Sequence, residues 1–261
     1  MIAAIQTTGL SFTFDRSIAL LIEALEAQGV SWRSIGFLTR TQELTGMDDL
    51  NTADPIFFYG STRLTEIAWE RGWRTLVFYA PTWFDPRSWI GKRQDLLNGF
   101  HRVITLDQLR RDWIREPTFV KSMELKVLTG QVIKESDQDK WIAAQDHIEG
   151  ETLVLLSPFV EIRKEWRFFV VDDVVVTGSL YRCDGQLSML EPISEDMWAR
   201  ARVLAHGWMP AKTVVMDVAL TRRGEYKVLE FNCLNSSGAY NSNMNDLVAA
   251  LRNKLSNGRE L

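Results

Sequence analysis

The feature that most limits the fold of this chain is a predicted β-hairpin over residues 213–232, in which two apolar segments flank a polar turn. Side chains alternate between the two faces of a strand. In the simplest register, Asp217 lies directly opposite Glu230, and Asn232 shares the face that carries both carboxylates. Because opposed Cβ atoms are about 4.5–5.5 Å apart, these three oxygen-bearing side chains form one cluster on an otherwise apolar sheet.

The register follows from the length of the turn. If residues 222–225 form the turn, Thr221 pairs with Tyr226, and counting back along both strands pairs Asn232 with Val215. Two carboxylates at this spacing repel each other unless a cation lies between them. Two anionic oxygens and one amide oxygen are hard ligands that suit Mg²⁺ when it holds phosphate groups. The hairpin therefore predicts a magnesium site.

The composition fits a globular chain with a large core. The 261 residues are 46% hydrophobic and 25% charged, and the net charge of -4 gives no overall attraction to nucleic acid or an anionic membrane. No segment approaches the roughly 20 apolar residues of a membrane span, and the N-terminus lacks the pattern of a signal peptide. Two distant cysteines predict neither a disulfide framework nor a thiolate zinc site. We expect a cytoplasmic protein.

Strand and helix signals alternate through the first part of the chain. Strands are expected at residues 2–7, 34–38, 55–59, 75–80 and 103–106. Apolar residues recur at helical spacing over 18–25, after Asp15 or Ser17 as the N-cap, and a second helix is capped by Ser61. Alternation of this kind predicts a parallel sheet covered by helices, here an α/β N-terminal domain over residues 1–116.

Beyond Pro117 the pattern changes to antiparallel strands mixed with helices. Strands are expected at 118–121 and 151–160, a second hairpin at 165–182 with its turn at Asp172-Asp173, and helices near 194–206 and toward the C-terminus. Such a mixture is α+β, and no Gly/Ser-rich linker separates the two parts. We therefore expect a closely packed second domain over residues 117–261, with antiparallel sheets and packed helices.

The second hairpin carries basic side chains on one face. With a two-residue turn, Arg167 pairs with Gly178 and Arg182 lies opposite Arg163, so that Glu165 shares the same face. Guanidinium groups on a strand face are placed for paired contacts with phosphate or carboxylate oxygens. A solvated polar face of a sheet has the same pattern, and both interpretations stay open on the residues alone.

Four further segments are candidates for ligand contacts, each with a plain structural alternative. Lys121 ends a strand and either binds phosphate or is a surface charge, and Lys126 follows closely. Residues 158–161 end an apolar strand at a proline, where freed backbone groups contact a base edge or the strand simply stops. Residues 60–61 precede a helix whose N-terminus binds an anion or is only capped by the serine. The small polar residues 235–240 line a substrate pocket or form a connecting loop.

In this order, the segments resemble the ATP-grasp superfamily. An acidic residue on one strand followed by Glu-x-Asn on the next resembles its metal motif, here Asp217, Glu230 and Asn232. Phe-Val-Lys at 119–121 is similar to its phosphate lysine, and 155–161 is similar to its adenine hinge strand. The chain is most similar to a small branch found in bacteria and phages. It departs from many ligases of the superfamily because the strand lysine is not followed by a glycine-rich loop.

The resemblance implies a fold, an α/β N-terminal domain followed by an α+β ATP-grasp domain, and a set of site residues. The implied nucleotide-binding residues are Lys121, Lys126, Pro158, Phe159, Val160, Glu161 and Glu165. The implied catalytic residues are Arg167, Arg182 and Lys126. The implied substrate contacts are Asn235, Ser236, Ser237, Gly238, Tyr240, Gly60 and Ser61.

The resemblance also implies an activity. A substrate carboxylate attacks the γ-phosphate of ATP, an acylphosphate and ADP form, and an amine or another nucleophile then displaces phosphate. ATP and two Mg²⁺ ions are the implied cofactors, and a small-molecule or peptide carboxylate and amine are the implied partners. Nucleic acid and membranes are not expected as partners, and formation of a homo-oligomer stays open. The alternatives are a phosphotransferase or end-modifying enzyme acting on another substrate, including nucleic acid, and a nucleotide-binding protein without catalysis.

Overall fold

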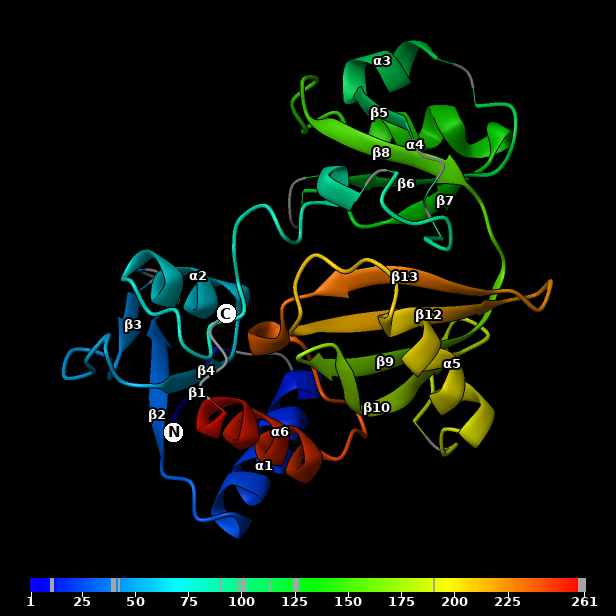
Figure 1. The fold of residues 1–261 in the computed structure, drawn as a ribbon. Coiled ribbons are helices and arrows are strands. Elements are labelled where there is room, and N and C mark those ends of the chain that lie inside the picture. The colour runs from blue at the N-terminus through cyan, green and yellow to red at the C-terminus, as the bar shows by residue number, and fades with distance from the viewer. Residues whose placement is uncertain are drawn as a thin grey trace.

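The computed structural model describes residues 1–9, 12–38, 41, 43–89, 91–97, 99, 102–112, 114–123, 127–189 and 191–257, with the backbone alone at 12–15. Within these residues the chain forms three β-sheets with helices packed against them (Figure 1). None of the described helices is long and apolar enough to span a membrane.

The N-terminal sheet has the order β3-β2-β1-β4 and is parallel except at its β3 edge. Its strands are β1 (Ile2–Gln6), β2 (Trp32–Leu38), β3 (Glu43–Thr45) and β4 (Ile56–Tyr59), and its helices are α1 (Phe12–Ala27) and α2 (Thr62–Glu70). Every residue of β4 is buried, because α1 and α2 cover opposite faces of the sheet. A strand covered on both sides needs an uninterrupted apolar run, and the predicted α/β layer is confirmed.

Helix α1 begins earlier than the sequence suggested. It starts at Phe12, so Asp15 and Ser17 lie inside the helix and neither is its N-cap. The hydroxyl of Ser17 instead accepts a hydrogen bond from the backbone N–H of Ala239, 2.8 Å away. The serine therefore fastens the helix to a loop from the far end of the chain.

The strand expected at residues 75–80 is absent, and Asn235 explains why a buried apolar segment can do without a strand partner. The Asn235 side chain is fully buried, and its Nδ2 donates to the carbonyl oxygens of Phe58, at 2.7 Å, and Leu76, at 2.8 Å. Its Oδ1 accepts from the backbone N–H of Phe78 at 2.7 Å. One amide thus satisfies backbone groups that a neighbouring strand would otherwise have to satisfy.

The second four-stranded sheet has the order β5-β8-β6-β7 and is antiparallel. Its strands are β5 (Arg102–Thr105), β6 (Thr118–Ser122), β7 (Gln131–Ile133) and β8 (Leu153–Pro158), with helices α3 (Leu106–Arg111) and α4 (Gln138–Ala144). Because β5 pairs with β8, the domain boundary expected at residues 116–117 does not coincide with a change of sheet. A short strand followed by a helix has the same sequence signal in either sheet, and only the pairing partner distinguishes the two.

The five-stranded sheet has the order β11-β10-β9-β12-β13 and is also antiparallel. Its strands are β9 (Ile162–Val171), β10 (Val174–Cys183), β11 (Gln186–Leu187), β12 (Val214–Thr221) and β13 (Tyr226–Asn232). Helix α5 (Glu195–Ala205) covers one face, and α6 (Met244–Ser256) packs with α1 against the other. Short 3-10 helices cover Pro86–Trp89, Glu135–Asp137 and Leu234–Ser236. The antiparallel sheets and packed helices confirm the α+β prediction.

The β9–β10 hairpin has the expected turn. Val171 pairs with Val174, as predicted. Asp172 and Asp173 have positive φ angles of 50° and 65°, as a type I′ turn requires. The short polar side chain of aspartate tolerates this backbone region better than most residues do.

Two β-bulges then change the pairing along β9 and β10. Arg167 does not lie opposite Gly178 but is paired one residue further along, and Arg182 lies opposite Glu165 instead of Arg163. The predicted register was wrong because each bulge inserts one unpaired residue. The new register brings a carboxylate beside Arg182 in place of a second cation.

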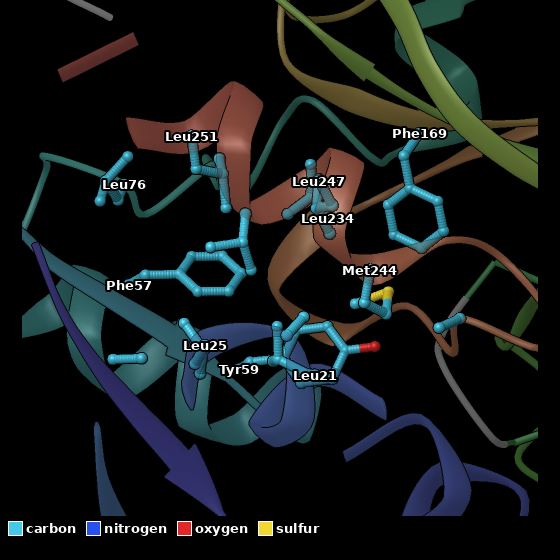
Figure 2. Packing of buried hydrophobic residues seen from close by; sticks show 14 of the residues in the cluster. Leu21, Leu25, Phe57, Tyr59, Leu76, Phe169, Leu234, Met244, Leu247 and Leu251 are labelled. Carbon is cyan, nitrogen blue, oxygen red and sulfur yellow. The ribbon is translucent and has the colours of Figure 1, made fainter. Parts of the chain in front are cut away.

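One hydrophobic cluster joins the N-terminal sheet to the five-stranded sheet. Figure 2 shows side chains from α1, β4, β9 and α6 packed together, among them Leu21, Leu25, Phe57, Tyr59, Phe169, Met244, Leu247 and Leu251. At its edge the Tyr59 hydroxyl donates to the carbonyl oxygen of Ser237 at 2.6 Å. The loop after β13 is therefore held by the N-terminal sheet.

Replacement of Asn235 by alanine should destabilise the chain by about 2–4 kcal/mol, because it leaves buried backbone groups without partners. Urea unfolding measures the effect. Asn253→Ala, on the exposed side of α6, is the control and should change the free energy of unfolding by no more than about 0.5 kcal/mol. Equal effects of the two changes would contradict the role assigned to Asn235.

Candidate active site

The β12–β13 hairpin brings the three expected metal ligands together. Asp217 lies opposite Glu230, and Asn232 lies opposite Val215, as predicted. Alternation along the strands then puts the two carboxylates and the amide on one face. The predicted cluster is thus present on the sheet.

The turn end of the same hairpin differs from its prediction. Tyr226 pairs with Leu220 and not with Thr221. A bulge between the pairs of Asp217 and Val218 shifts the register by one residue. The error in the turn and the bulge cancel, which is why the pairs at the ligand end of the hairpin match.

Arg167 of β9 is the direct partner of Asp217. Its Nε donates to Oδ1 of Asp217 at 2.8 Å and its Nη2 donates to Oδ2 at 2.7 Å, a bidentate pair that is nearly closed to solvent. Its Nη1 donates to the carbonyl oxygen of Gly238 at 3.3 Å. The guanidinium is therefore used within the protein, and its geometry suits a positioning role better than direct contact with a phosphoryl group.

The pair shifts the titration of both groups. Burial raises the pKa of Asp217 to about 6, with Arg167 opposing the rise and Glu230 adding to it. Burial lowers the pKa of Arg167, but the charge and hydrogen bonds of Asp217 outweigh this and leave it raised. Asp217 thus keeps its charge at neutral pH, although a buried carboxylate is costly without a cation.

Asn232 shows that the cluster fits a small hard cation. Its Nδ2 lies 3.3 Å from Oδ2 of Asp217 and 3.1 Å from Oε1 of Glu230. Ligands about 2.1 Å from an octahedral Mg²⁺ lie about 3 Å from one another, and rotation of the amide exchanges its nitrogen for its oxygen. Within the described residues, no group of three or more His, Cys, Asp or Glu side chains could hold a metal ion, so a site here depends on this amide oxygen.

A cleft of about 460 Å³, the metal-side cleft, opens in front of this hairpin. It gathers five of the expected site residues, Lys121, Glu230, Asn232, Ser236 and Ser237. It also gathers residues that the sequence reasoning missed, including Thr62, Glu66, Tyr79, Phe84 and Trp89. The latter come from the N-terminal part of the chain, where no motif marked them.

A second cavity of about 470 Å³, the hinge cavity, holds the other expected nucleotide residues. The expected residues that line it are Pro158, Phe159, Val160, Glu161, Glu165 and Arg182. Apolar side chains from other elements complete it, among them Leu97, Phe119, Val132 and Leu229. These were missed because each belongs to a different strand or to an irregular segment, and their meeting depends on the packing of two sheets.

The two cavities adjoin along β6 and β13. Phe119 lines the hinge cavity and Lys121 the metal-side cleft, and residues two apart on a strand share a face about 7 Å apart. On β13 the neighbours Leu229 and Glu230 divide in the same way. An elongated ligand can therefore place an apolar ring in one cavity and its charged part in the other.

Glu165 connects the basic strand pair to the hinge cavity. The Tyr181 hydroxyl donates to its Oε2 at 2.6 Å, and Nε of Arg182 lies 3.8 Å from its Oε1. The ring of Tyr181 stacks on Tyr240, with centroids 4.8 Å apart, and the Arg167 guanidinium lies within 5.6 Å of both centroids. Burial raises the pKa of Tyr181, so it remains a neutral donor.

The expected substrate loop is only partly open to the cleft. The Ser237 hydroxyl donates to the Cys233 carbonyl oxygen at 2.7 Å, and the Asn235 amide is fully used, as described above. Ser236 lines the cleft, and Tyr240 has a positive φ of 52° that presents its ring to Tyr181. The loop is thus a rigid part of the site rather than a row of free polar groups.

The expected anion site at Gly60 and Ser61 is occupied by contacts within the protein. Ser61 caps α2 by accepting from the N–H of Leu64 at 3.3 Å, and its hydroxyl donates to Gln6 at 2.7 Å. Gly60 donates its N–H to the carbonyl oxygen of Asn235 at 2.9 Å. Lys126 lies outside the described residues, and its expected role stays a prediction.

An apolar hinge cavity beside an acidic hairpin, between two antiparallel sheets, is the arrangement of an ATP-grasp domain. The model of an ATP-grasp domain family, family 2 of its clade, matches residues 100–250, and the chain belongs to this family. No curated protein sequence matches the chain.

Solved structures share the fold over nearly the whole chain. D-cycloserine synthetase DcsG has a TM-score of 0.66 at 16% identity, with 98% of this chain and 100% of that chain covered. D-alanyl-alanine synthetase A from Vibrio cholerae has a TM-score of 0.61 at 14% identity, with 98% of each chain covered. ATP-grasp ligase PsnB, complexed with minimal precursor, has a TM-score of 0.58 at 15% identity, with 97% and 98% covered. At these identities the likeness shows the fold alone.

The pKa of Asp217 gives a testable dependence of stability on pH. Its folded value of about 6 lies above the value of about 4 in an unfolded chain. The folded state therefore binds the proton more tightly, and stability should fall as the pH rises through this window, by about 1–3 kcal/mol. Urea unfolding without Mg²⁺ should show this decline in the wild type but not in Asp217→Asn. Parallel curves for the two proteins would contradict it.

Proposed function

We propose that this chain is an ATP-dependent ligase that joins a carboxylate to an amine and releases ADP and phosphate. The observation that carries the proposal is the apolar hinge cavity adjoining a cleft that holds Lys121, Glu230 and Asn232. An adenine ring suits the first cavity, and a triphosphate with Mg²⁺ suits the second. Membership in the ATP-grasp family supports this placement.

The proposed reaction has two steps. A carboxylate oxygen of the substrate attacks the γ-phosphorus of ATP; the bond to the β–γ bridging oxygen breaks, and ADP leaves with the electron pair. The amine nitrogen of the acceptor then attacks the acyl carbon, the C–O bond to phosphate breaks, and the nitrogen loses one proton. Such chemistry depends mainly on positioning and on neutralising phosphate charge.

The side chains have distinct roles in this proposal. Lys121 donates to phosphate oxygens, and the backbone of residues 158–161 contacts the adenine edge. Arg182, beside Glu165 in the hinge cavity, acts at the nucleotide. When bound at Asp217, Glu230 and Asn232, two Mg²⁺ ions supply positive charge to the triphosphate.

Arg167 acts as a positioning residue. It fixes both oxygens of Asp217 and holds the Gly238 carbonyl, so it joins the metal hairpin to the loop at the cleft. A lysine cannot reproduce this fork of donors. Its contribution is therefore geometric as well as electrostatic.

The names of the structural neighbours support amino acids or peptides as the substrate class to test first. They include a D-cycloserine synthetase, a D-alanyl-alanine synthetase and a ligase complexed with a precursor peptide. The decisive experiment is a screen for ADP release with Mg²⁺, ATP, and pairs of amino acids and short peptides. Hydroxylamine added in place of the amine should trap an acylphosphate as a hydroxamate. Release of AMP, or no nucleotide product with any pair, would overturn the proposal.

Glu230→Gln should lower the rate of ADP formation by about a hundredfold or more, because it removes one anionic metal ligand while conserving shape. Steady-state kinetics at varied Mg²⁺ concentration measures the loss. Glu225→Gln, an exposed change at the turn of the same hairpin, is the matched control and should retain wild-type rates. Wild-type turnover in both variants would exclude the metal assignment.

Lys121→Met should raise the KM for ATP by about tenfold or more, because a charge-assisted bond to phosphate is lost. Lys140→Met, an exposed change on α4 beside the same sheet, should leave KM unchanged. Initial rates at varied ATP concentration distinguish them. If both variants match the wild type, Lys121 is a surface charge and not a nucleotide contact.

A further inference from the structure

The metal-side cleft has a second wall that the family does not assign. Glu66 on α2, together with Tyr79, Phe84 and Trp89, lines the cleft opposite the hairpin residues. All four precede residues 100–250, the segment that the ATP-grasp family matches. Their presence in the same cleft as Glu230 and Asn232 places them at the site where a second substrate has to enter.

Glu66 provides the anionic group of this wall. Its side chain is 29% exposed, and its nearest cation, Nη1 of Arg63, is 3.4 Å away. Arg63 is itself shared with Glu70, also at 3.4 Å, and is largely exposed. A long contact divided between two carboxylates and screened by water neutralises little of the charge.

The other carboxylate of the wall is fully paired. Arg87 donates to Asp85 from Nε, at 3.0 and 2.9 Å, and from Nη2, at 2.6 Å. Such a bidentate pair leaves little charge to attract a ligand. Glu66 is therefore the acidic side chain of this wall that a cationic ligand group would meet.

Aromatic rings surround the approach to Glu66. Tyr79 and Phe84 stack with centroids 6.4 Å apart at 24°, and Trp89 packs edge-on against Phe231 at 5.4 Å. Burial raises the pKa of Tyr79 and the Glu66 charge adds to it, so the phenol stays neutral. Faces of neutral aromatic rings attract cations within about 6 Å and also cover flat apolar groups.

The cleft separates charges of opposite sign. Lys121 lies on β6 and Glu66 on α2, which belong to different parts of the molecule (Figure 1). An ammonium group is repelled from the lysine and attracted to the glutamate, whereas a phosphate group has the reverse preference. The two ends of the cleft therefore suit different reactants.

We propose that the α2 side of the metal-side cleft binds the primary ammonium group of the acceptor substrate, an amine attached to a flat apolar body. The word acceptor rests on the proposed ligase function, whereas binding of the amine does not. Glu66 pairs with the ammonium group, and Tyr79, Phe84 and Trp89 cover the apolar body. The hairpin end of the cleft is left for the phosphates.

The test uses phenethylamine and its uncharged analogue 2-phenylethanol as probes of the full chain, by ligand-observed NMR titration. Glu66→Gln should weaken phenethylamine binding by about tenfold or more and leave 2-phenylethanol binding unchanged. Glu70→Gln, which also faces Arg63 but is more exposed, is the control and should behave as the wild type. Thermal melting of each variant verifies that it is folded.

Phe84→Leu is the second variant and should weaken phenethylamine severalfold through loss of the aromatic face. Equal affinity of wild type and Glu66→Gln for phenethylamine would overturn the proposal, and so would an equal loss in Glu70→Gln. The outcome is independent of turnover. If the amine binds as described but no substrate pair releases ADP, the ligase proposal fails and the amine site stands; ADP release with unchanged amine binding in Glu66→Gln gives the reverse.

Discussion

The buried pair of Arg167 and Asp217 is the interaction on which the rest of the site depends. A carboxylate without exposure to water is costly unless a cation and several donors satisfy it, and removal of one partner from such a pair typically costs about 3–5 kcal/mol. Here the guanidinium uses both of its edges, on Asp217 and on the Gly238 carbonyl. The same contact thus stabilises the centre of the five-stranded sheet and sets the position of the loop beside the cleft.

The geometry around this pair results from side-chain alternation on three strands. On β9, Arg167 faces the site while its neighbours Trp166 and Phe168 pack under α5. On β6 and β13, successive residues divide between the hinge cavity and the metal-side cleft. A strand needs no special backbone for this arrangement, only polar residues on one face and apolar residues on the other.

The sequence predicted those parts of the structure that depend on local periodicity. The pairing of Asp217 with Glu230, the α/β layer and the Ser61 cap follow from residues near one another in the chain. The register of β9–β10 could not be predicted because bulges carry no sequence signal there. The strand expected at 75–80 failed because a side chain distant in sequence, Asn235, bonds its backbone. The wall around Glu66 was missed since its residues meet only after α2 and the Pro86–Trp89 turn pack beside the hairpin.

The contacts of Asn235 and Tyr59 have a consequence for how ligands enter. Both fasten the loop after β13 to the N-terminal sheet, and one hydrophobic cluster continues across this junction. The β5-β8-β6-β7 sheet has a hydrophobic cluster of its own that shares no residue with the others described. Opening of the nucleotide site is therefore a swing of this sheet, which carries Lys121, about the connection at 159–161. The remaining two sheets act as a fixed base against which it closes.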